Sequence, residues 1–309
     1  MMSSRYNWLD WMKTIGMYFI VYGHFTSYGH EFVYTFSVPL FFVMSGFLYN
    51  QESDSFKKNF YNLILPMLIM TVIVQLRLNV SHIINGEFTS KKFFQIIIGV
   101  LRGDQTFLGA CWFIYTLLII KLVSKFCTTV VSRIILCIIC SFISILLSHR
   151  GIYAQNSWIN VCLSYPFFLI GMLLREYKVL IVRGRVIYFA VSLFITYICS
   201  VYNGPVWVFK NDYGHHFLLY LLGGMSGTLL VYIVCLWLDG VKSRVVLTIS
   251  TGSIIVLGLH FSIIFYFRII PELDFLSAFV VLILFVPVIR CCERYVPILL
   301  GKYRVKSQK

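Results

Sequence analysis

The sequence is poor in charged residues. Only 12% of its 309 residues are Asp, Glu, Lys or Arg, against roughly 25% in an average soluble domain, and 59% are hydrophobic. This deficit excludes a soluble globular protein, and long apolar runs joined by short connections predict an all-α, polytopic membrane protein. Long loops are lacking as well, which leaves no room for a soluble catalytic domain. We therefore treat residues 1–309 as a single transmembrane domain.

Paired cysteines are also lacking. The nine cysteines fall almost entirely within the apolar runs, with neither a disulfide framework nor the spacing of a metal site. We interpret them as buried small apolar residues and expect no metal cofactor. The net charge of +14 is spread over short connections rather than gathered on one face, which excludes a nucleic-acid binder.

About ten segments approach the roughly 20 apolar residues that a helix needs to cross a bilayer. The predicted spans are 8–28, 33–49, 60–80, 107–125, 131–148, 158–174, 186–202, 216–238, 247–268 and 274–292. Residues 91–101 are predicted to form a short interfacial helix. Pro66 is expected to kink the third span, and Gly223 and Gly227 are expected to allow close helix contacts.

The lysines and arginines predict the orientation. With the N-terminus in the cytoplasm, 19 of them fall on the cytoplasmic side and 6 on the outer side, while Arg77 lies within a span. Because positive connections stay in the cytoplasm, this bias predicts an even number of spans with both termini cytoplasmic. No internal repeat is evident, which disfavours a secondary transporter.

The first span carries ionisable residues. Lys13 and His24 are eleven residues apart, which places them on one helix face, about 16 Å apart along the axis. Ionisable groups at this depth normally face the protein interior or a water-filled cavity, so the face is predicted to line a polar path across most of the membrane. Asp10 shares this face and can pair with Lys13. The alternatives are an ion pair that only anchors the helix end and a hydrogen-bonded core histidine.

Three further residues have two interpretations each. Arg77 should face the cavity or extend to the membrane interface, because a charge in lipid costs about 2.5–3.5 kcal/mol. His260, in the ninth span, is either a second polar wall of the same site or a packed core histidine. Trp112 is expected in the aromatic belt at the membrane interface rather than on the wall of a binding site.

Two stretches resemble a known family. LDWMKTIGMYFIVYGHF (Leu9–Phe25) and FSVPLFFVMSGFLY (Phe36–Tyr49) look like the opening of the membrane-bound acyltransferase 3 family, whose members O-acylate surface glycans and related acceptors. A basic residue, ten intervening residues and a histidine, here Lys13 and His24, are similar to that family's most diagnostic motif. Weaker resemblances follow at KKNFYNLILPMLI, CWFIYTLLI and ISTGSIIVLGLH, and together they cover nearly the whole chain.

The resemblance implies an O-acyltransferase in the cytoplasmic membrane of a bacterium. Its donor would be acyl-coenzyme A, with acetyl-coenzyme A expected, and its acceptor a hydroxyl of a surface or lipid-linked glycan. We expect His24 to be catalytic, either as a base, because a neutral imidazole can take the hydroxyl proton, or as a residue that briefly carries the acyl group itself. The residues expected to bind substrates are Lys13, Asp10, Arg77, His260, Lys57 and Lys58.

The chain departs from the family before Pro66. Arginines are usual there, whereas this chain has Asn59 and Asn62, so the charge that would hold the donor's phosphates is reduced to Lys57 and Lys58. The alternative to acyl transfer is an exporter of polysaccharides or small molecules, which would use the same polar path without modifying its cargo. A membrane sensor is a further alternative, but it would have little use for such a path.

Overall fold

The computed structural model describes residues 6–25, 29–152, 155–177, 184–267 and 273–301. Within these ranges the chain is helical apart from short connections and two isolated bridges, which confirms the all-helical prediction. Some residues used to predict the orientation lie outside the described ranges, namely Arg5, Lys178, Arg183, Arg268, Lys302, Arg304, Lys306 and Lys309.

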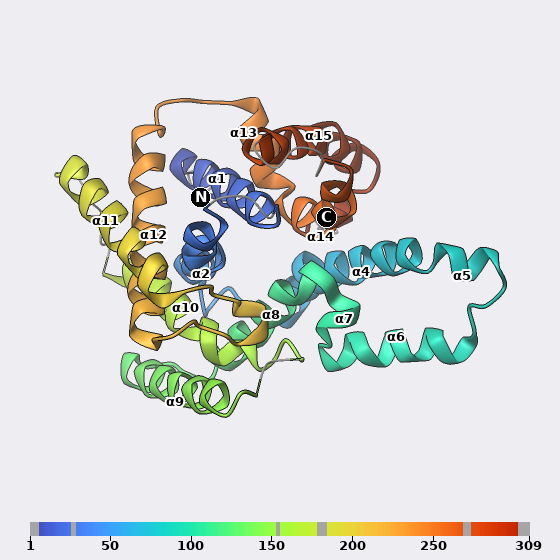
Figure 1. Cartoon of the computed structure of the whole chain (residues 1–309), viewed down its shortest axis with the longest axis horizontal. Coiled ribbons are helices and arrows are strands. Elements are labelled where there is room, and N and C mark those ends of the chain that lie inside the picture. Colours follow the sequence, from blue (N-terminus) through green and yellow to red (C-terminus); the bar gives the residue numbers. More distant parts are fainter. Residues whose placement is uncertain (1–5, 26–28, 153–154, 178–183, 268–272, 302–309) are drawn as a thin grey trace, which may run out of the picture.

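The helices follow one another in an irregular bundle (Figure 1). The described α-helices are α1 (Asn7–Gly23), α2 (His30–Leu48), α3 (Phe56–Asn59), α4 (Leu65–Leu78), α5 (Val80–Ile84), α6 (Ser90–Arg102), α7 (Gln105–Leu108), α8 (Trp112–Ser124), α9 (Val130–His149), α10 (Asn160–Glu176), α11 (Arg185–Asn203), α12 (Phe217–Trp237), α13 (Arg244–Thr251), α14 (Ser253–Ile264) and α15 (Asp274–Tyr295). Short 3₁₀ segments are η2 (Gly109–Cys111), η3 (Val208–Lys210), η4 (Phe265–Phe267) and η6 (Pro297–Leu300), and η1 (Phe60–Ile64) is a π-helical turn.

Each predicted span overlaps helical residues, which in the third, fourth and ninth spans belong to more than one helical segment. Among the described residues, seven helical segments are long and apolar enough, and the bent pair α13–α14 is an eighth candidate. α1 and α10 are only 17 residues long and carry ionisable groups. By length and composition, seven or eight spans are thus supported among the described residues, and the count of about ten stays a prediction.

The predicted ninth span, 247–268, is not one continuous helix. α13 ends at Thr251, and α14 continues after Gly252 at an angle of 85°. A side chain on Gly252 would collide with Ile289 of α15, so the glycine allows the bend to pack closely against that helix. Apolar composition does not reveal such a bend, because both halves are also compatible with a straight span. The bend places α14 beside α1 and α4.

α2 is the central helix, in contact with α1, α10, α11 and α12. It crosses α10 at two glycines: a Cβ on Gly46 would collide with the carbonyl oxygen of Phe168, and a Cβ on Gly171 with that of Val43. Small residues at such crossings let helix backbones approach closely, as is common in membrane bundles. The predicted packing role of Gly223 and Gly227 is confirmed, because these α12 residues contact Thr35 and Phe36 of α2.

Two smaller predictions have mixed outcomes. Pro66 lies in the first turn of α4, directly after the π-helical turn η1, so the third span is irregular where the kink was predicted. All nine cysteines are free, and Cys111, Cys140, Cys199 and Cys235 are buried. Cys291, near the end of α15, is exposed, so the burial prediction is wrong for that residue.

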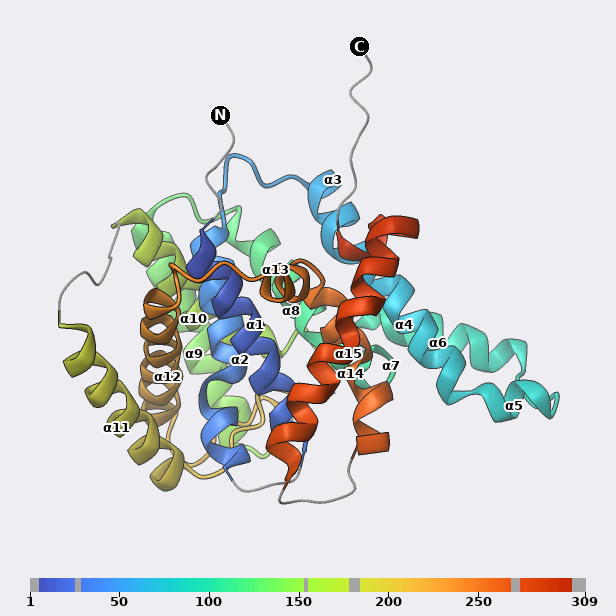
Figure 2. The ribbon, with the colours of Figure 1, turned by 90° about the horizontal axis from the view of Figure 1, so that it is seen from above.

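The two ends of the described chain lie on one side of the bundle. α1 begins and α15 ends on the side that also carries α3 (Figure 2). An even number of crossings requires this arrangement, whereas the assignment of that side to the cytoplasm stays a prediction. α4, α5 and α6 extend away from the bundle as an arm, and α7 leads back to α8 (Figure 1).

Candidate active site

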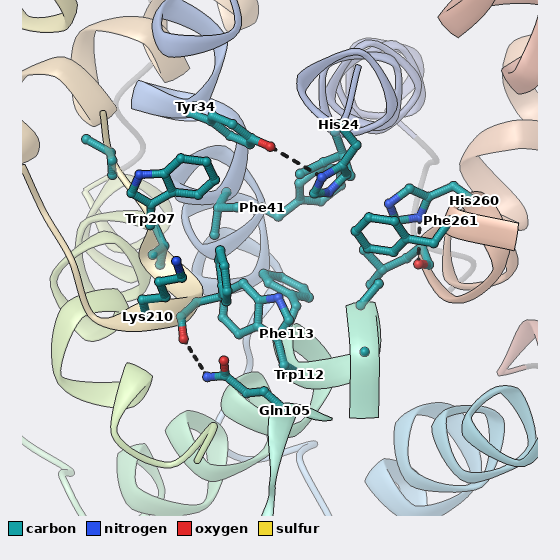
Figure 3. Close-up of a pocket in the computed structure, with 18 of the residues that line it drawn as sticks. His24, Tyr34, Phe41, Gln105, Trp112, Phe113, Trp207, Lys210, His260 and Phe261 are labelled. Atoms are coloured by element: carbon teal, nitrogen blue, oxygen red, sulfur yellow. Dashed lines mark hydrogen bonds between the residues drawn. The ribbon is translucent and has the colours of Figure 1, made fainter. Parts of the chain in front are cut away.

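A cavity of about 1070 Å³ lies where α1 ends. It is enclosed by α1, α2 and α14, by the segment from Asp104 to Phe113, and by the loop 206–212 (Figure 3). Its volume is that of a small-molecule site, and its lining combines many aromatic rings with a few polar groups. α1 begins on the opposite side of the bundle, so the cavity belongs to the side predicted to face outward (Figure 2).

His24 lines this cavity as the first residue after α1. Its side chain is half-buried, and its Nδ1 lies 3.3 Å from the hydroxyl oxygen of Tyr34 on α2. Gly23 allows this approach, because a Cβ there would lie only 3.1 Å from the Tyr34 ring. His24 thus lies at a cavity wall beside a hydroxyl group. This position does not fit the alternative of a histidine packed in the core.

His260 lies on the facing wall. Its ring is fully buried, its centroid is 5.0 Å from that of His24, and the two rings are stacked (Figure 3). Nδ1 lies 2.8 Å from the carbonyl oxygen of Leu257 and 3.0 Å from that of Val256. Carbonyl oxygens only accept hydrogen bonds, so Nδ1 carries the proton and Nε2 of the neutral ring is an acceptor. Among the described residues, that Nε2 has no hydrogen-bond partner.

The Tyr34 hydroxyl can set the proton distribution on His24. If Nδ1–H donates to the Tyr34 oxygen, the lone pair of the neutral imidazole is on Nε2 and can take a proton. Tyr34 would then hold the ring in the way that a third group orients the base in other acyl transfer sites. Phe261, whose ring centroid is 4.3 Å from that of His24, further restricts the ring.

Lys13 does not line the cavity. On α1 the lining consists of Met17, Ile20 and His24, so the predicted polar path is apolar between its two ends. Asp10 is buried and accepts a hydrogen bond of 2.6 Å from Ser250 on α13. The predicted continuous polar path is therefore wrong for this conformation, because the residues one and two turns beyond Lys13 carry only hydrocarbon and thioether groups.

The other predicted cations also lie away from the cavity. Arg77 is exposed near the C-terminal end of α4, so the expectation that it faces the cavity is wrong and the alternative, an outward position, holds. Its helix leaves the bundle at this point, which lets the guanidinium stay outside. Lys57 and Lys58 are exposed on α3, at the side where α1 begins (Figure 2). Whether either contacts a donor stays a prediction.

A polar cluster that the sequence did not suggest lies next to these lysines. Lys121 Nζ is 3.4 Å from Asp54 Oδ1 and 3.2 Å from Asn59 Oδ1, and Asn59 Nδ2 donates to Asp54 Oδ2 at 2.9 Å. Asn59 is buried in this cluster, which joins α3 to α8. The exposed charge of this segment comes from Lys57 and Lys58.

Several residues that line the cavity were not predicted from the sequence. Trp112 was expected in an interfacial belt, but it lines the cavity at the start of α8, directly after the 3₁₀ turn η2. Trp207 and Lys210 come from the loop 206–212, and Gln105 from α7. The available signal was modest: the connection NGPVWVFKND is one of the longest on the outer side, and aromatic and charged residues in such a loop are typical of binding.

One family match extends over nearly the whole chain. Residues 6–295 match the acyltransferase 3 family, described as an acyltransferase domain. The chain belongs to this family. Searches among curated proteins and among solved structures give no match. Together with the apolar helices, membership in the acyltransferase 3 family makes the protein a multi-pass membrane acyltransferase.

Proposed function

We propose that this member of the acyltransferase 3 family is an O-acetyltransferase of the bacterial cytoplasmic membrane. It takes an acetyl group from cytoplasmic acetyl-coenzyme A and transfers it to a hydroxyl of a surface or lipid-linked glycan. The observation that carries the proposal is His24: its imidazole lines a cavity of about 1070 Å³ and its Nδ1 lies beside the Tyr34 hydroxyl.

The proposed reaction uses His24 as a general base. The acceptor oxygen attacks the carbonyl carbon of the thioester while its proton passes to Nε2 of His24. The carbon–sulfur bond then breaks, and the leaving thiolate of coenzyme A takes the proton from the imidazolium. In this scheme Tyr34 accepts a hydrogen bond from Nδ1–H and stabilises the charged ring.

The ring of His260 lines the same cavity. Its Nδ1 is committed to two backbone carbonyls, so the buried Nε2 can only accept. A buried acceptor without a partner is costly, and a substrate that donates an O–H or N–H to it would remove that cost. In the proposal, His260 therefore binds substrate but does not remove its proton.

The donor is proposed to reach the cavity from the side where α1 begins. Lys13 lies there, about 16 Å from His24 along the helix, and an ammonium at that position can hold a phosphate of coenzyme A. Met17 and Ile20 separate the two, and their apolar side chains suit the largely uncharged pantetheine arm. Lys57 and Lys58 are further candidates for phosphate contacts, because they are exposed on that side.

The decisive experiment is transfer of label. Purified full-length protein in lipid nanodiscs is incubated with acetyl-coenzyme A labelled in the acetyl group and with candidate glycans, and the glycans are then separated and counted. The proposal expects labelled glycan with the mass of one added acetyl group, and free coenzyme A in equal amount. Glycan that crosses a vesicle membrane with unchanged mass would instead identify an exporter and would refute the proposal.

A further inference from the structure

The loop 206–212 forms part of the cavity wall. It turns through η3 and closes on itself by two backbone hydrogen bonds between Trp207 and Asp212, of 2.9 and 3.2 Å. Asn211 completes the turn in the left-handed region, with φ at 60°, which asparagine tolerates better than most residues. The loop therefore has a defined shape that does not depend on a ligand.

Side chains from three helices fix this loop in place. Asn160 of α10 donates to the carbonyl oxygen of Phe209 at 3.0 Å, and Gln105 of α7 donates to the same oxygen. Ser144 of α9 donates to Asn211 Oδ1 at 2.9 Å, in a fully buried contact. The side chains that such a loop presents are preorganised, so a ligand that binds them does not have to order the loop first.

The loop presents an indole ring and an ammonium group to the cavity. The Trp207 ring is half-buried and lies 5.3 Å from the Tyr34 ring, whose hydroxyl is beside His24 (Figure 3). Lys210 Nζ lies over two aromatic rings, 5.3 Å from that of Trp207 and 5.4 Å from that of Phe209. Among the described residues, no carboxylate oxygen is within 4.0 Å of that ammonium group.

The two carboxylates that line the cavity each accept a hydrogen bond from the backbone of their own segment. Asp104 accepts a hydrogen bond of 2.8 Å from the backbone N–H of Thr106, and Asp212 accepts one of 3.0 Å from that of Gly214. Each caps its own segment of backbone. Both carboxylates keep their negative charge, and Lys210 is the lysine of the described cavity lining that can pair with an anionic ligand.

We infer that Trp207 and Lys210 form an acceptor subsite for an acidic sugar, an inference that rests on the proposed function. The apolar face of a pyranose ring packs on the Trp207 indole, and a carboxylate or phosphate on that sugar binds the Lys210 ammonium. Tyr34 contacts both Trp207 and His24, so a sugar on this platform lies next to the proposed base. The subsite thus selects glycans that carry a negative charge close to the hydroxyl that is acylated.

The test measures binding and transfer separately. Full-length protein in nanodiscs is given labelled galactose oligomers, galacturonic acid oligomers of equal length, and galactose oligomers that carry phosphate. Equilibrium dialysis gives the dissociation constant of each, and the acetyl transfer assay is run on the same set. The second and third oligomers distinguish a carboxylate from a phosphate as the recognised group.

The variants Lys210→Gln, Lys210→Arg and Trp207→Ala show which of the two residues recognises the charge and which binds the sugar ring. Wild type is expected to bind an acidic oligomer at least about threefold more tightly than the neutral one, a modest factor because Lys210 is exposed. Lys210→Gln should abolish this preference, and Lys210→Arg should keep most of it. Trp207→Ala should weaken binding of acidic and neutral oligomers alike, by about tenfold. Lys91→Gln is the matched control, because Lys91 is an exposed lysine on α6 outside the cavity lining.

Three outcomes would overturn the inference. The first is equal binding of acidic and neutral oligomers by wild-type protein. The second is a preference for acidic oligomers that survives Lys210→Gln. The third is a Lys210→Gln variant that binds acetyl-coenzyme A more weakly and the oligomers unchanged. Failure of the proposed function gives a different result, namely no acetyl group on any acceptor while the binding preference for acidic oligomers persists.

Discussion

Replacing His24 by alanine tests the proposed chemistry most directly. The substitution removes the imidazole beside Tyr34 and leaves the fold little changed, because His24 lies after the last turn of α1 and is only half-buried. If the ring takes the acceptor's proton, turnover should fall by about 10²- to 10⁴-fold, the usual contribution of general acid–base catalysis. Donor binding should largely persist, because the predicted phosphate contacts lie at the other end of α1.

The Tyr34→Phe variant tests a smaller change at the same site. It removes only the hydroxyl, whose oxygen is 3.3 Å from His24 Nδ1, and keeps the ring that contacts Trp207. A hydrogen bond of this length is worth about 0.5–1.5 kcal/mol, which corresponds to a loss of roughly two- to tenfold in turnover. His24→Ala should therefore lower turnover far more than Tyr34→Phe does.

The assay is turnover per folded molecule, with the folded fraction taken from size-exclusion chromatography and thermal unfolding. His260→Ala is measured in the same assay. It should raise KM for the substrate that donates a hydrogen bond to Nε2 more than it lowers turnover. A His24→Ala protein with near-normal turnover, or one that loses only yield, would refute the reasoning.

Three other predictions concern the donor side, the packing and the orientation. Lys13→Ala should raise KM for acetyl-coenzyme A about three- to tenfold more than KM for the acceptor, and Lys13→Arg should partly restore it; equal effects on both substrates would contradict a donor role. Gly46→Ala should lower the unfolding temperature and the folded yield, because its Cβ would collide with a backbone carbonyl of α10 at a cost of about 1–3 kcal/mol. Gly240→Ala, whose Cβ would meet no atom within 4 Å, is its neutral control. A reporter that is active only outside the cytoplasm, fused after Lys309, should be silent, and strong activity there would reverse the predicted orientation.

Much of the fold could be predicted because it depends on composition along the chain. Each expected span overlaps a helix or consecutive helical segments, since apolar runs of this length have few alternatives to a helix in a membrane. The 85° bend at Gly252 was not predictable, because it depends on close packing against Ile289 rather than on a break in hydropathy.

The site was predictable only in part, for a related reason. His24 and His260 stood out because imidazoles are unusual in apolar spans, and the structure brings them to one cavity. Lys13 was expected to share a polar path with His24, but a common helix face does not decide whether the residues between them are polar. Trp207 and Lys210 reach the cavity through contacts of their loop with three helices, and no local pattern encodes such contacts.

The polar contacts of α1 also bear on how the protein is made. Trp8 donates its backbone N–H to Asp239, and Asp10 accepts from Ser250, so both partners are synthesised more than 230 residues later. Until α13 emerges from the ribosome, Asp10 lacks its hydrogen bond from Ser250, and α1 lacks its contacts with α13, α14 and α15. α1 should therefore wait near the translocon or at the membrane surface during most of translation. Chains truncated before residue 239 are expected to leave it accessible to protease, and full-length chains to protect it.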